Sequence, residues 1–229
     1  MRRQLDLFDA ATGVPIAFDP AFRSLSRREL SDGAWLEYAP GWVSGHDALF
    51  DQLEQALAWR TERRHMYDRL VDTPRLLAGV PRDGIVEDMR RALSQRYREE
   101  FVRTTAALYR DGSDSVAFHG DTTARDMDQA LVATVSLGQP RRFLLKPTAG
   151  GASTEPRRDS AALLAGSESR LAIAYELGRG DLIVMGGTCQ RTWRHGIPKV
   201  AHAAGPRIAL MFRPSWSEDD EGESKLPAR

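Results

Sequence analysis

Residues 108–121, Leu-Tyr-Arg-Asp-Gly-Ser-Asp-Ser-Val-Ala-Phe-His-Gly-Asp, are the stretch on which the interpretation of this chain depends. They end in a histidine and a carboxylate at His119 and Asp121, and two side chains at this spacing share one face of a strand. His195, much later in the chain, offers a further imidazole. Two histidines and one carboxylate leave three positions of an octahedral Fe(II) open, which suits oxygen chemistry. On spacing alone, His119 as an ordinary hydrogen-bonded histidine is the other interpretation.

The composition bounds the possible classes of protein. The chain has 229 residues, of which 41% are hydrophobic and 28% charged, as in a typical globular domain. Lysine plus arginine and aspartate plus glutamate both total 32, so the net charge indicates no general affinity for polyanions. The single cysteine, Cys189, cannot form an internal disulfide, so we expect a buried thiol and a cytoplasmic protein. No apolar run reaches the length that spans a bilayer, and we expect no membrane partner.

Two amphipathic helices are expected in the first hundred residues, over 46–59 and 83–98, with Ser44 as the N-cap of the first. A short strand is expected over 34–38. Six further segments are short, apolar or alternating, and bounded by glycine, proline or charge. They are residues 101–109, 131–137, 142–146, 171–177, 181–185 and 207–213. This order predicts a mainly β core with helices packed on one side.

We expect one domain over residues 1–214, with an N-terminal α/β support over about 1–100 and a β core over about 101–214. Residues 150–170 are rich in glycine, serine, proline and arginine, which predicts a long mobile loop. Residues 215–229 are acidic and polar, which predicts a disordered tail.

The segment from Arg207 to Arg213 carries a second chemical motif. In a strand the two arginines share one face, and the apolar residues 208, 210 and 212 take the other. Two guanidinium groups on an inward face need an anion, and arginine suits bidentate contact with a carboxylate. The strand is therefore a candidate to hold a dicarboxylate beside the metal. An exposed face for both arginines is the alternative.

Several segments, taken in order, resemble AlkB-type 2-oxoglutarate- and Fe(II)-dependent dioxygenases, a family of oxidative nucleic-acid dealkylases. Residues 108–121 resemble the metal-binding segment of this family. Five other matches run in the family's order: Pro74-Arg75 ("PR"), 135–143 ("SLG…R.F"), 180–187 ("GDLLVMGG"), 190–199 ("Q..W.H..PK") and 207–213 ("R.NLTFR"). One such motif is weak evidence, but the ordered set covers about residues 30–214.

The resemblance implies three iron ligands and three residues at the cosubstrate: His119, Asp121 and His195 for Fe(II), and Tyr109, Arg207 and Arg213 for 2-oxoglutarate. Of the two arginines, the first is the better candidate for the distal carboxylate. The implied fold is a double-stranded β-helix, a jelly-roll core with an N-terminal helical support. The implied reaction is oxidative demethylation of nucleic-acid bases, a DNA repair activity. It uses molecular oxygen and releases an aldehyde, succinate and carbon dioxide. The implied partner is alkylated DNA or RNA, single-stranded, bound by a monomer.

Two positions depart from the family pattern. Ala107 and Ala209 stand where many members have asparagines that help to hold 2-oxoglutarate. These departures motivate one other function, a non-catalytic nucleic-acid-binding AlkB-like protein. The same iron chemistry on a protein or small molecule also stays open. The segment 76–81 contains no aromatic residue to stack on a flipped base. Six arginines are candidates for a phosphate-binding rim, with a solvated face as the alternative: Arg60, Arg63, Arg64, Arg75, Arg141 and Arg142.

Overall fold

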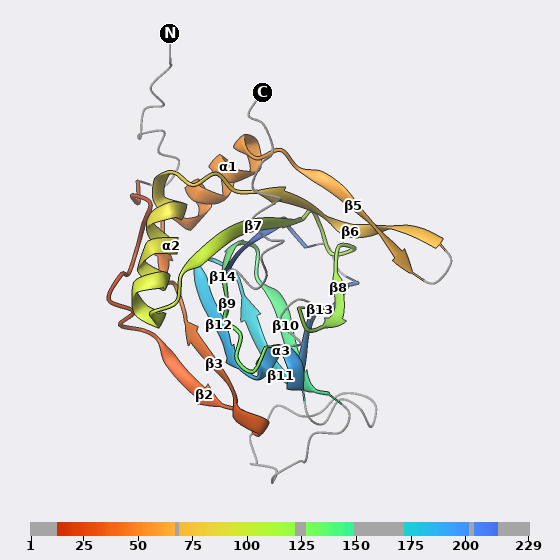
Figure 1. Cartoon of the computed structure of the whole chain (residues 1–229). Coiled ribbons are helices and arrows are strands. Elements are labelled where there is room, and N and C mark those ends of the chain that lie inside the picture. The colour runs from red at the N-terminus through yellow and green to blue at the C-terminus, as the bar shows by residue number, and fades with distance from the viewer. Residues whose placement is uncertain (1–12, 67–68, 122–126, 149–171, 202–203, 215–229) are drawn as a thin grey trace.

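The computed structural model describes residues 13–66, 69–121, 127–148, 172–201 and 204–214 (Figure 1). Its helices are α1 (His46–Ala56), α2 (Gly84–Tyr97) and the short α3 (Cys189–Thr192), with a 3-10 turn at Ser31–Gly33. Its strands are β1 (Ala17–Phe18), β2 (Ser26–Glu29), β3 (Ala34–Ala39), β4 (Val43–Ser44), β5 (Arg60–Met66), β6 (Arg69–Gly79), β7 (Phe101–Tyr109), β8 (Val116–His119), β9 (Val132–Gly138), β10 (Arg141–Pro147), β11 (Ile173–Leu177), β12 (Asp181–Gly187), β13 (Trp193–Ile197) and β14 (Arg207–Pro214).

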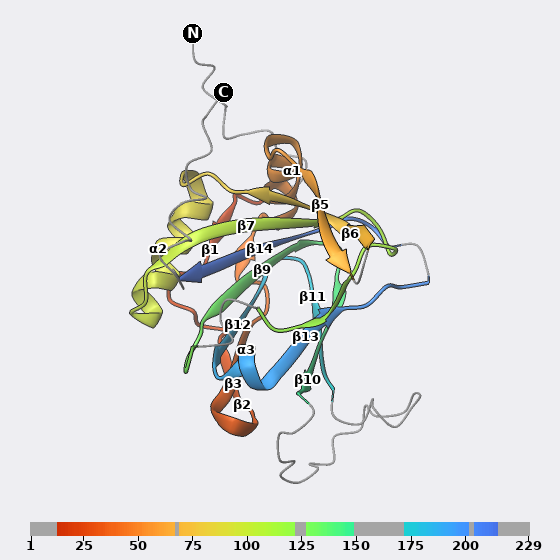
Figure 2. The ribbon, with the colours of Figure 1, turned by 45° about the vertical axis from the view of Figure 1, so that its right-hand side comes forward.

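Two antiparallel sheets form the body of the protein. The large sheet has the order β2-β3-β12-β9-β14-β7-β6-β5, and the small sheet has the order β11-β10-β13-β8. The chain passes between the sheets repeatedly, because β9 and β12 belong to the large sheet whereas β10 and β13 belong to the small one (Figure 2). This is the jelly-roll core that the sequence predicted, with few helices.

Each face of the large sheet has its own core. Along β14, Ile208 and Phe212 point to the outer face, where they pack with residues of α1 and α2 such as Leu49 and Met89. Ala209 points to the inner face, toward the small sheet. The alternation of β14 therefore places Arg207, its first residue, and Arg213, near its end, on the inner side with Ala209. The helices cover the outer face and leave the space between the sheets for the site (Figure 1).

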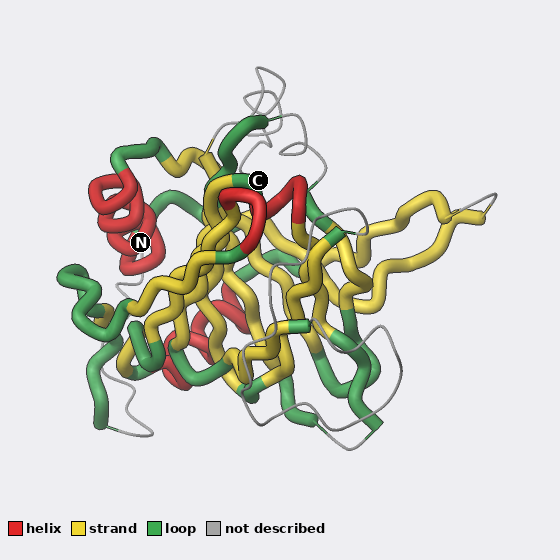
Figure 3. The backbone as a smooth tube through the Cα atoms, turned by 90° about the horizontal axis from the view of Figure 1, so that it is seen from below, coloured by secondary structure: helices red, strands yellow, loops and turns green. Residues whose placement is uncertain are grey.

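The N-terminal strands extend the large sheet. β3 pairs with β12, and β6 pairs with β7, so strands before residue 100 share one sheet with strands after it. We did not predict β5 and β6, which form a hairpin that projects from the body (Figure 3). Segment 60–66, which forms β5, is rich in arginine and lacks the apolar alternation of a half-buried strand, so its sequence did not indicate a strand.

The predicted helices and most predicted strands are confirmed to within a few residues. The prediction of Ser44 as N-cap was wrong: Gly45 takes this position with φ 60°, and the Ser44 hydroxyl points to the carbonyls of Pro15 and Ala17 instead. A Cβ on Gly45 would lie 2.8 Å from the Pro15 carbonyl oxygen, so both the turn and the space require glycine.

Cys189 is buried, as expected, and burial raises the pKa of its thiol to about 12. Within the described part of the chain, no helix is both long and apolar enough to cross a membrane. The loop predicted over 150–170 and the tail predicted over 215–229 lie outside the described residues.

Candidate active site

The structure brings the three predicted iron ligands together. His119 ends β8 and lies directly opposite His195 in β13, with ring centroids 4.4 Å apart. Asp121 follows two residues later, and its Oδ1 lies 3.8 Å from Nε2 of His119. One ligand atom from each residue lies within 4.8 Å of the others. The strand ends before Asp121, so a turn at Gly120 rather than strand alternation brings the carboxylate to the histidines.

Gly120 leaves room for this turn. A Cβ at this position would lie 2.1 Å from the carbonyl oxygen of Gln190, closer than any side chain allows. The side chain of Gln190 accepts a hydrogen bond from the backbone N–H of Asp121 at 3.0 Å. The glycine thus lets the ligand segment pack directly against α3. Gln190 belongs to the family-like segment 190–199, but its contact with the ligand segment could not be predicted.

Neighbouring groups orient each of the three side chains. Nδ1 of His119 lies 2.9 Å from the Ala117 carbonyl oxygen, so this nitrogen carries the proton and Nε2 is left for a metal. Oδ2 of Asp121 accepts a hydrogen bond from Nε of Arg213 at 2.7 Å. The ring of His195 stacks on Phe143, with centroids 5.6 Å apart and an interplanar angle of 26°. Fixed ligands of this kind are typical of metal sites.

The electrostatic surroundings favour the protonation states that bind metals. Burial, together with the neighbouring His119, lowers the pKa of His195 to about 3. Burial alone would raise the pKa of Asp121, but the charges of Arg213 and the histidines outweigh it, so this pKa lies below its usual value. A neutral imidazole and an ionised carboxylate are the forms that coordinate a metal. The donor set is therefore the one that suits Fe(II).

Arg207 lies on the inner face, at the start of β14, and is fully buried. Its guanidinium lies 5.1 Å from the centroid of the Tyr109 ring, on the residue paired with it in β7, and its Nη2 donates to Oγ of Ser136. Among the described residues, its Nε and Nη1 have no hydrogen-bond partner. Burial lowers the pKa of Arg207 to about 10.

A buried guanidinium with two unpaired nitrogens is costly unless an anion binds to it. A carboxylate accepts strong, charge-assisted hydrogen bonds from such a group, and the distal carboxylate of 2-oxoglutarate is such an anion. The observation therefore favours the anion interpretation of Arg207 over the exposed face that was the alternative. Serine at position 136 is a neighbour that we did not predict.

Arg213, at the other end of β14, also points inward. It contacts the carboxylate of Asp121 and, through Nη1, Oγ1 of Thr105 at 3.2 Å. The sequence predicted a position near the cosubstrate and the substrate side. Its contact with Asp121 places it beside the candidate metal ligand, and its contact with the cosubstrate stays a prediction.

Ala107 and Ala209 are paired directly across β7 and β14, and both are buried. The next pair on the same face is Tyr109 with Arg207. The two departures from the family pattern therefore lie side by side, next to the candidate carboxylate site. One part of the wall of this site therefore carries two alanines where many family members have two asparagines.

The six arginines that we considered as one phosphate-binding rim do not lie together. Arg75 and Arg141 are buried, whereas Arg60 and Arg142 are exposed. The other two have side chains outside the described set. Arginine occurs both on solvated faces and at buried positions, so the sequence could not show which of these six arginines are exposed.

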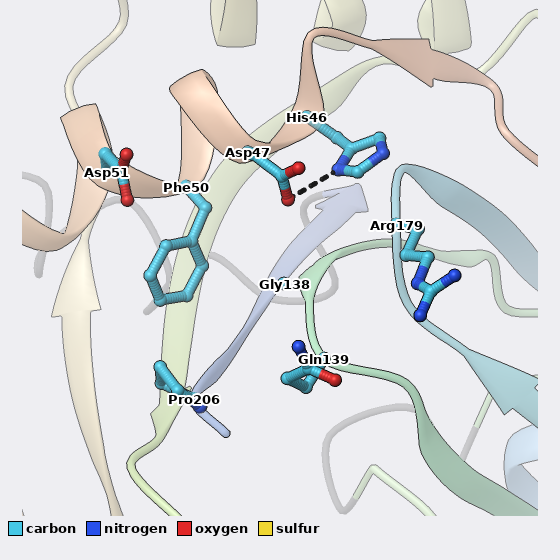
Figure 4. Close-up of a pocket in the computed structure, with 8 residues that line it drawn as sticks. All are labelled: His46, Asp47, Phe50, Asp51, Gly138, Gln139, Arg179 and Pro206. Carbon is cyan, nitrogen blue, oxygen red and sulfur yellow. Dashed lines mark hydrogen bonds and ion pairs between the residues drawn. The ribbon is translucent and has the colours of Figure 1, made fainter. Parts of the chain in front are cut away.

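A cavity of about 520 Å³ lies elsewhere. Figure 4 shows it between the first turns of α1 and the loops that precede β12 and β14. Its lining residues are His46, Asp47, Phe50, Asp51, Gly138, Gln139, Arg179 and Pro206. None of the predicted site residues lines it. A smaller cavity of about 180 Å³ borders the metal segment at Gly120, between α3 and β13.

Comparisons with known proteins agree with this geometry. A family model described as "2OG-Fe(II) oxygenase superfamily" matches residues 26–213. The human "Alpha-ketoglutarate-dependent dioxygenase alkB homolog 3" is 25% identical over 196 residues, which cover 76% of this chain and 64% of the relative. The "DNA oxidative demethylase ALKBH2" of Arabidopsis thaliana is 35% identical over 109 residues, which cover 46% of this chain and 35% of the relative.

The match therefore spans less than two thirds of the length of either curated relative. A solved structure, an oxidoreductase of the 2OG-Fe(II) oxygenase family from Burkholderia pseudomallei, aligns with a TM-score of 0.46 at 16% identity. That alignment covers 74% of this chain and 78% of the other.

Proposed function

The chain belongs to the 2OG-Fe(II) oxygenase superfamily and is of the AlkB type, and from this premise we propose that it is an oxidative demethylase that removes N-alkyl groups from nucleic-acid bases. The observation that carries the proposal is the cluster of His119, Asp121 and His195 beside a buried arginine with two free N–H groups. The first part fits Fe(II), and the second fits the carboxylate of 2-oxoglutarate. Both groups are used by this superfamily.

In this proposal, His119 holds the iron through Nε2, because its Nδ1 is engaged by the Ala117 carbonyl. Asp121 presents Oδ1, because Arg213 engages Oδ2. His195 would supply the third protein ligand from the neighbouring strand. Two histidines and one carboxylate would leave coordination positions for the cosubstrate and oxygen.

Arg207 would orient the cosubstrate, because its buried guanidinium, with Nε and Nη1 unpaired, would bind the distal carboxylate. The Tyr109 ring packs against the same guanidinium and closes this end of the site. When bound, Fe(II) and 2-oxoglutarate activate oxygen for hydroxylation of an N-methyl carbon, with release of formaldehyde, succinate and carbon dioxide. Arg207 and Tyr109 are both buried, which keeps bulk water away from this end of the site.

The substrate class rests on the relatives. One curated relative is named a DNA oxidative demethylase and another an alkB homolog. We extend this to alkylated DNA or RNA, with single strands preferred because the target base must be unstacked. A cytoplasmic monomer with a role in DNA repair is part of the same proposal.

Turnover tests this proposal. Purified protein with Fe(II), ascorbate and 2-oxoglutarate should demethylate a single-stranded oligonucleotide that carries one N-methylated base, with formaldehyde and succinate formed in equal amounts. Succinate without demethylation would point to the same chemistry on a protein or small molecule. Neither product from iron-loaded protein would exclude the proposed activity.

The paired alanines favour a second candidate, a non-catalytic nucleic-acid-binding protein. With Ala107 and Ala209, the wall beside the cosubstrate lacks two hydrogen-bonding side chains that many family members have. Each such hydrogen bond would stabilise the bound cosubstrate by about 0.5–1.5 kcal/mol. This candidate predicts no heat of 2-oxoglutarate binding in a calorimetric titration with Mn(II) present. Measurable binding would exclude it.

A further inference from the structure

Arg141 is the first residue of β10 and points into the protein, with 2% of its surface exposed. Arg142, the next residue, points the opposite way, and its side chain is 57% exposed. Neighbouring arginines of one strand therefore have opposite surroundings. Among the described residues, Arg141 forms no ion pair with a carboxylate.

The guanidinium of Arg141 binds main-chain carbonyls from two separate segments. Its Nη1 donates to the Asp111 carbonyl at 2.9 Å, and its Nη2 donates to the Asp114 carbonyl at 2.9 Å. The same Nη2 also donates to the Pro198 carbonyl at 2.8 Å. The first two carbonyls belong to the loop that leads into β8, and the third directly follows β13.

Both of these segments lead to candidate iron ligands. The loop 110–115 runs into the strand that ends at His119, and Pro198 follows the strand that contains His195. A second link joins them, because the backbone N–H of Val200 donates to the Gly112 carbonyl at 2.9 Å. Arg141 thus connects the two flanks of the metal site at one end of the small sheet.

β8 needs such an anchor. It is an edge strand of the small sheet, and its pairing with β13 consists of two residue pairs with an irregular register between them. So short a ladder fixes the position of His119 weakly. Side chains also hold the connection from β7 to β8, including Asp114, which accepts two hydrogen bonds from the side chain of Arg110.

A role in stability alone explains Arg141 poorly. Burying a charge with only neutral carbonyl partners is costly, and an apolar side chain of similar size is often as stable in such a position. The planar fork of the guanidinium, however, fixes three acceptors in one geometry, which neither lysine nor methionine can do.

We infer that Arg141 is a positioning residue that holds the His119 strand in register with the His195 strand, and so sets the geometry of the iron site. This inference rests on the proposed function, because it assigns the two histidines to one metal. Arg141 acts in this inference through the two segments that it holds, and not as a metal ligand. Its loss should shift the ligands rather than remove one.

Cobalt binding tests the inference without turnover. Co(II) is titrated into wild type, Arg141→Met, Arg141→Lys and the matched control Arg142→Met, and both affinity and the visible ligand-field spectrum are recorded. Arg142→Met removes only an exposed contact with Glu176 at 3.8 Å. We expect Arg141→Met to bind Co(II) roughly 10-fold more weakly or worse, with an altered spectrum.

Arg141→Lys should show the same defect in part, because it keeps the charge and loses the fork, and the control should match wild type. Wild-type affinity and spectrum in Arg141→Met would overturn the inference. If that variant does not fold, Arg141→Lys decides by the same criteria, and unfolding of both would show that Arg141 serves the fold and overturn it equally. Failure of the wild type to bind Co(II) would instead refute the proposed metal site.

Discussion

Nε of Arg213 donates to Oδ2 of Asp121 at 2.7 Å, so the last strand of the jelly roll holds the carboxylate of the candidate metal site. The same strand begins at Arg207, whose Nε and Nη1 are free to bind an anion. One strand, β14, therefore supplies an arginine to each half of the site. Arg213 holds Asp121, a metal ligand that the protein provides. Arg207 is available to bind an anion from solution.

Replacing Arg213 by methionine should free the Asp121 carboxylate to rotate. We expect the rate of succinate release to fall about 10–100-fold, as is usual when the partner of a metal ligand is lost. Arg213→Lys should keep more of the wild-type rate than Arg213→Met does. The control Arg28→Met, on the exposed far edge of the large sheet, should keep the full wild-type rate. An unchanged rate in Arg213→Met would show that this ion pair does not position the ligand.

Gly120→Ala should disturb the candidate metal site through a steric clash. The added Cβ would meet the Gln190 carbonyl at 2.1 Å and push Asp121 away from the histidines. We expect Mn(II) affinity, followed by electron paramagnetic resonance, to drop at least 10-fold. Gly79→Ala is the matched control, because a Cβ there has nothing within 4 Å. Equal behaviour of the two variants would refute this account of the turn.

Ala209→Asn should strengthen cosubstrate binding, because it restores a hydrogen-bonding group beside Arg207 and Tyr109. The expected gain is about 0.5–1.5 kcal/mol, or roughly two- to tenfold in the dissociation constant of 2-oxoglutarate. Calorimetry with Mn(II) present measures it. Ala209→Leu, similar in size but apolar, should weaken binding, and equal effects of both changes would indicate that only packing matters.

Acid should weaken the contact between α2 and the sheet. Hydrogen bonds from Arg90, opposed in part by burial, lower the pKa of Glu87 to about 2 from its ordinary 4.5. The stability that this carboxylate contributes is therefore complete above pH 4.5 and lost as the pH falls toward 2. Urea unfolding of Glu87→Gln should start from a lower stability at pH 7 and show a flatter pH dependence. If the free energy of unfolding changed with pH equally in the variant and the wild type, this prediction would be contradicted.

Much of the fold could be predicted from local pattern. β7 was predicted with its bounds, because it is a short, mainly apolar run that ends at the charged turn beginning with Arg110. The strands β5, β8 and β13 were not predicted, because they are short or rich in charge and owe their structure to pairing rather than to propensity.

The candidate site could be predicted as a set of residues but not as a geometry. The ordered resemblance named His119, Asp121 and His195, and the structure places them together. The direction in which an arginine points is not encoded in its neighbours: Arg141 and Arg142 are adjacent, yet one is an internal anchor and the other a surface charge. Such roles depend on contacts between distant segments, which only the folded chain defines.

The central claim is that His119, Asp121 and His195 hold one iron to which 2-oxoglutarate binds beside Arg207. The most direct measurement is the visible absorption of the anaerobic protein with Fe(II) as 2-oxoglutarate is added. A charge-transfer band should develop to saturation at one equivalent of iron in the wild type, and it should be absent from His195→Ala. A wild type without the band, or a His195→Ala variant that retains it, would contradict the claim.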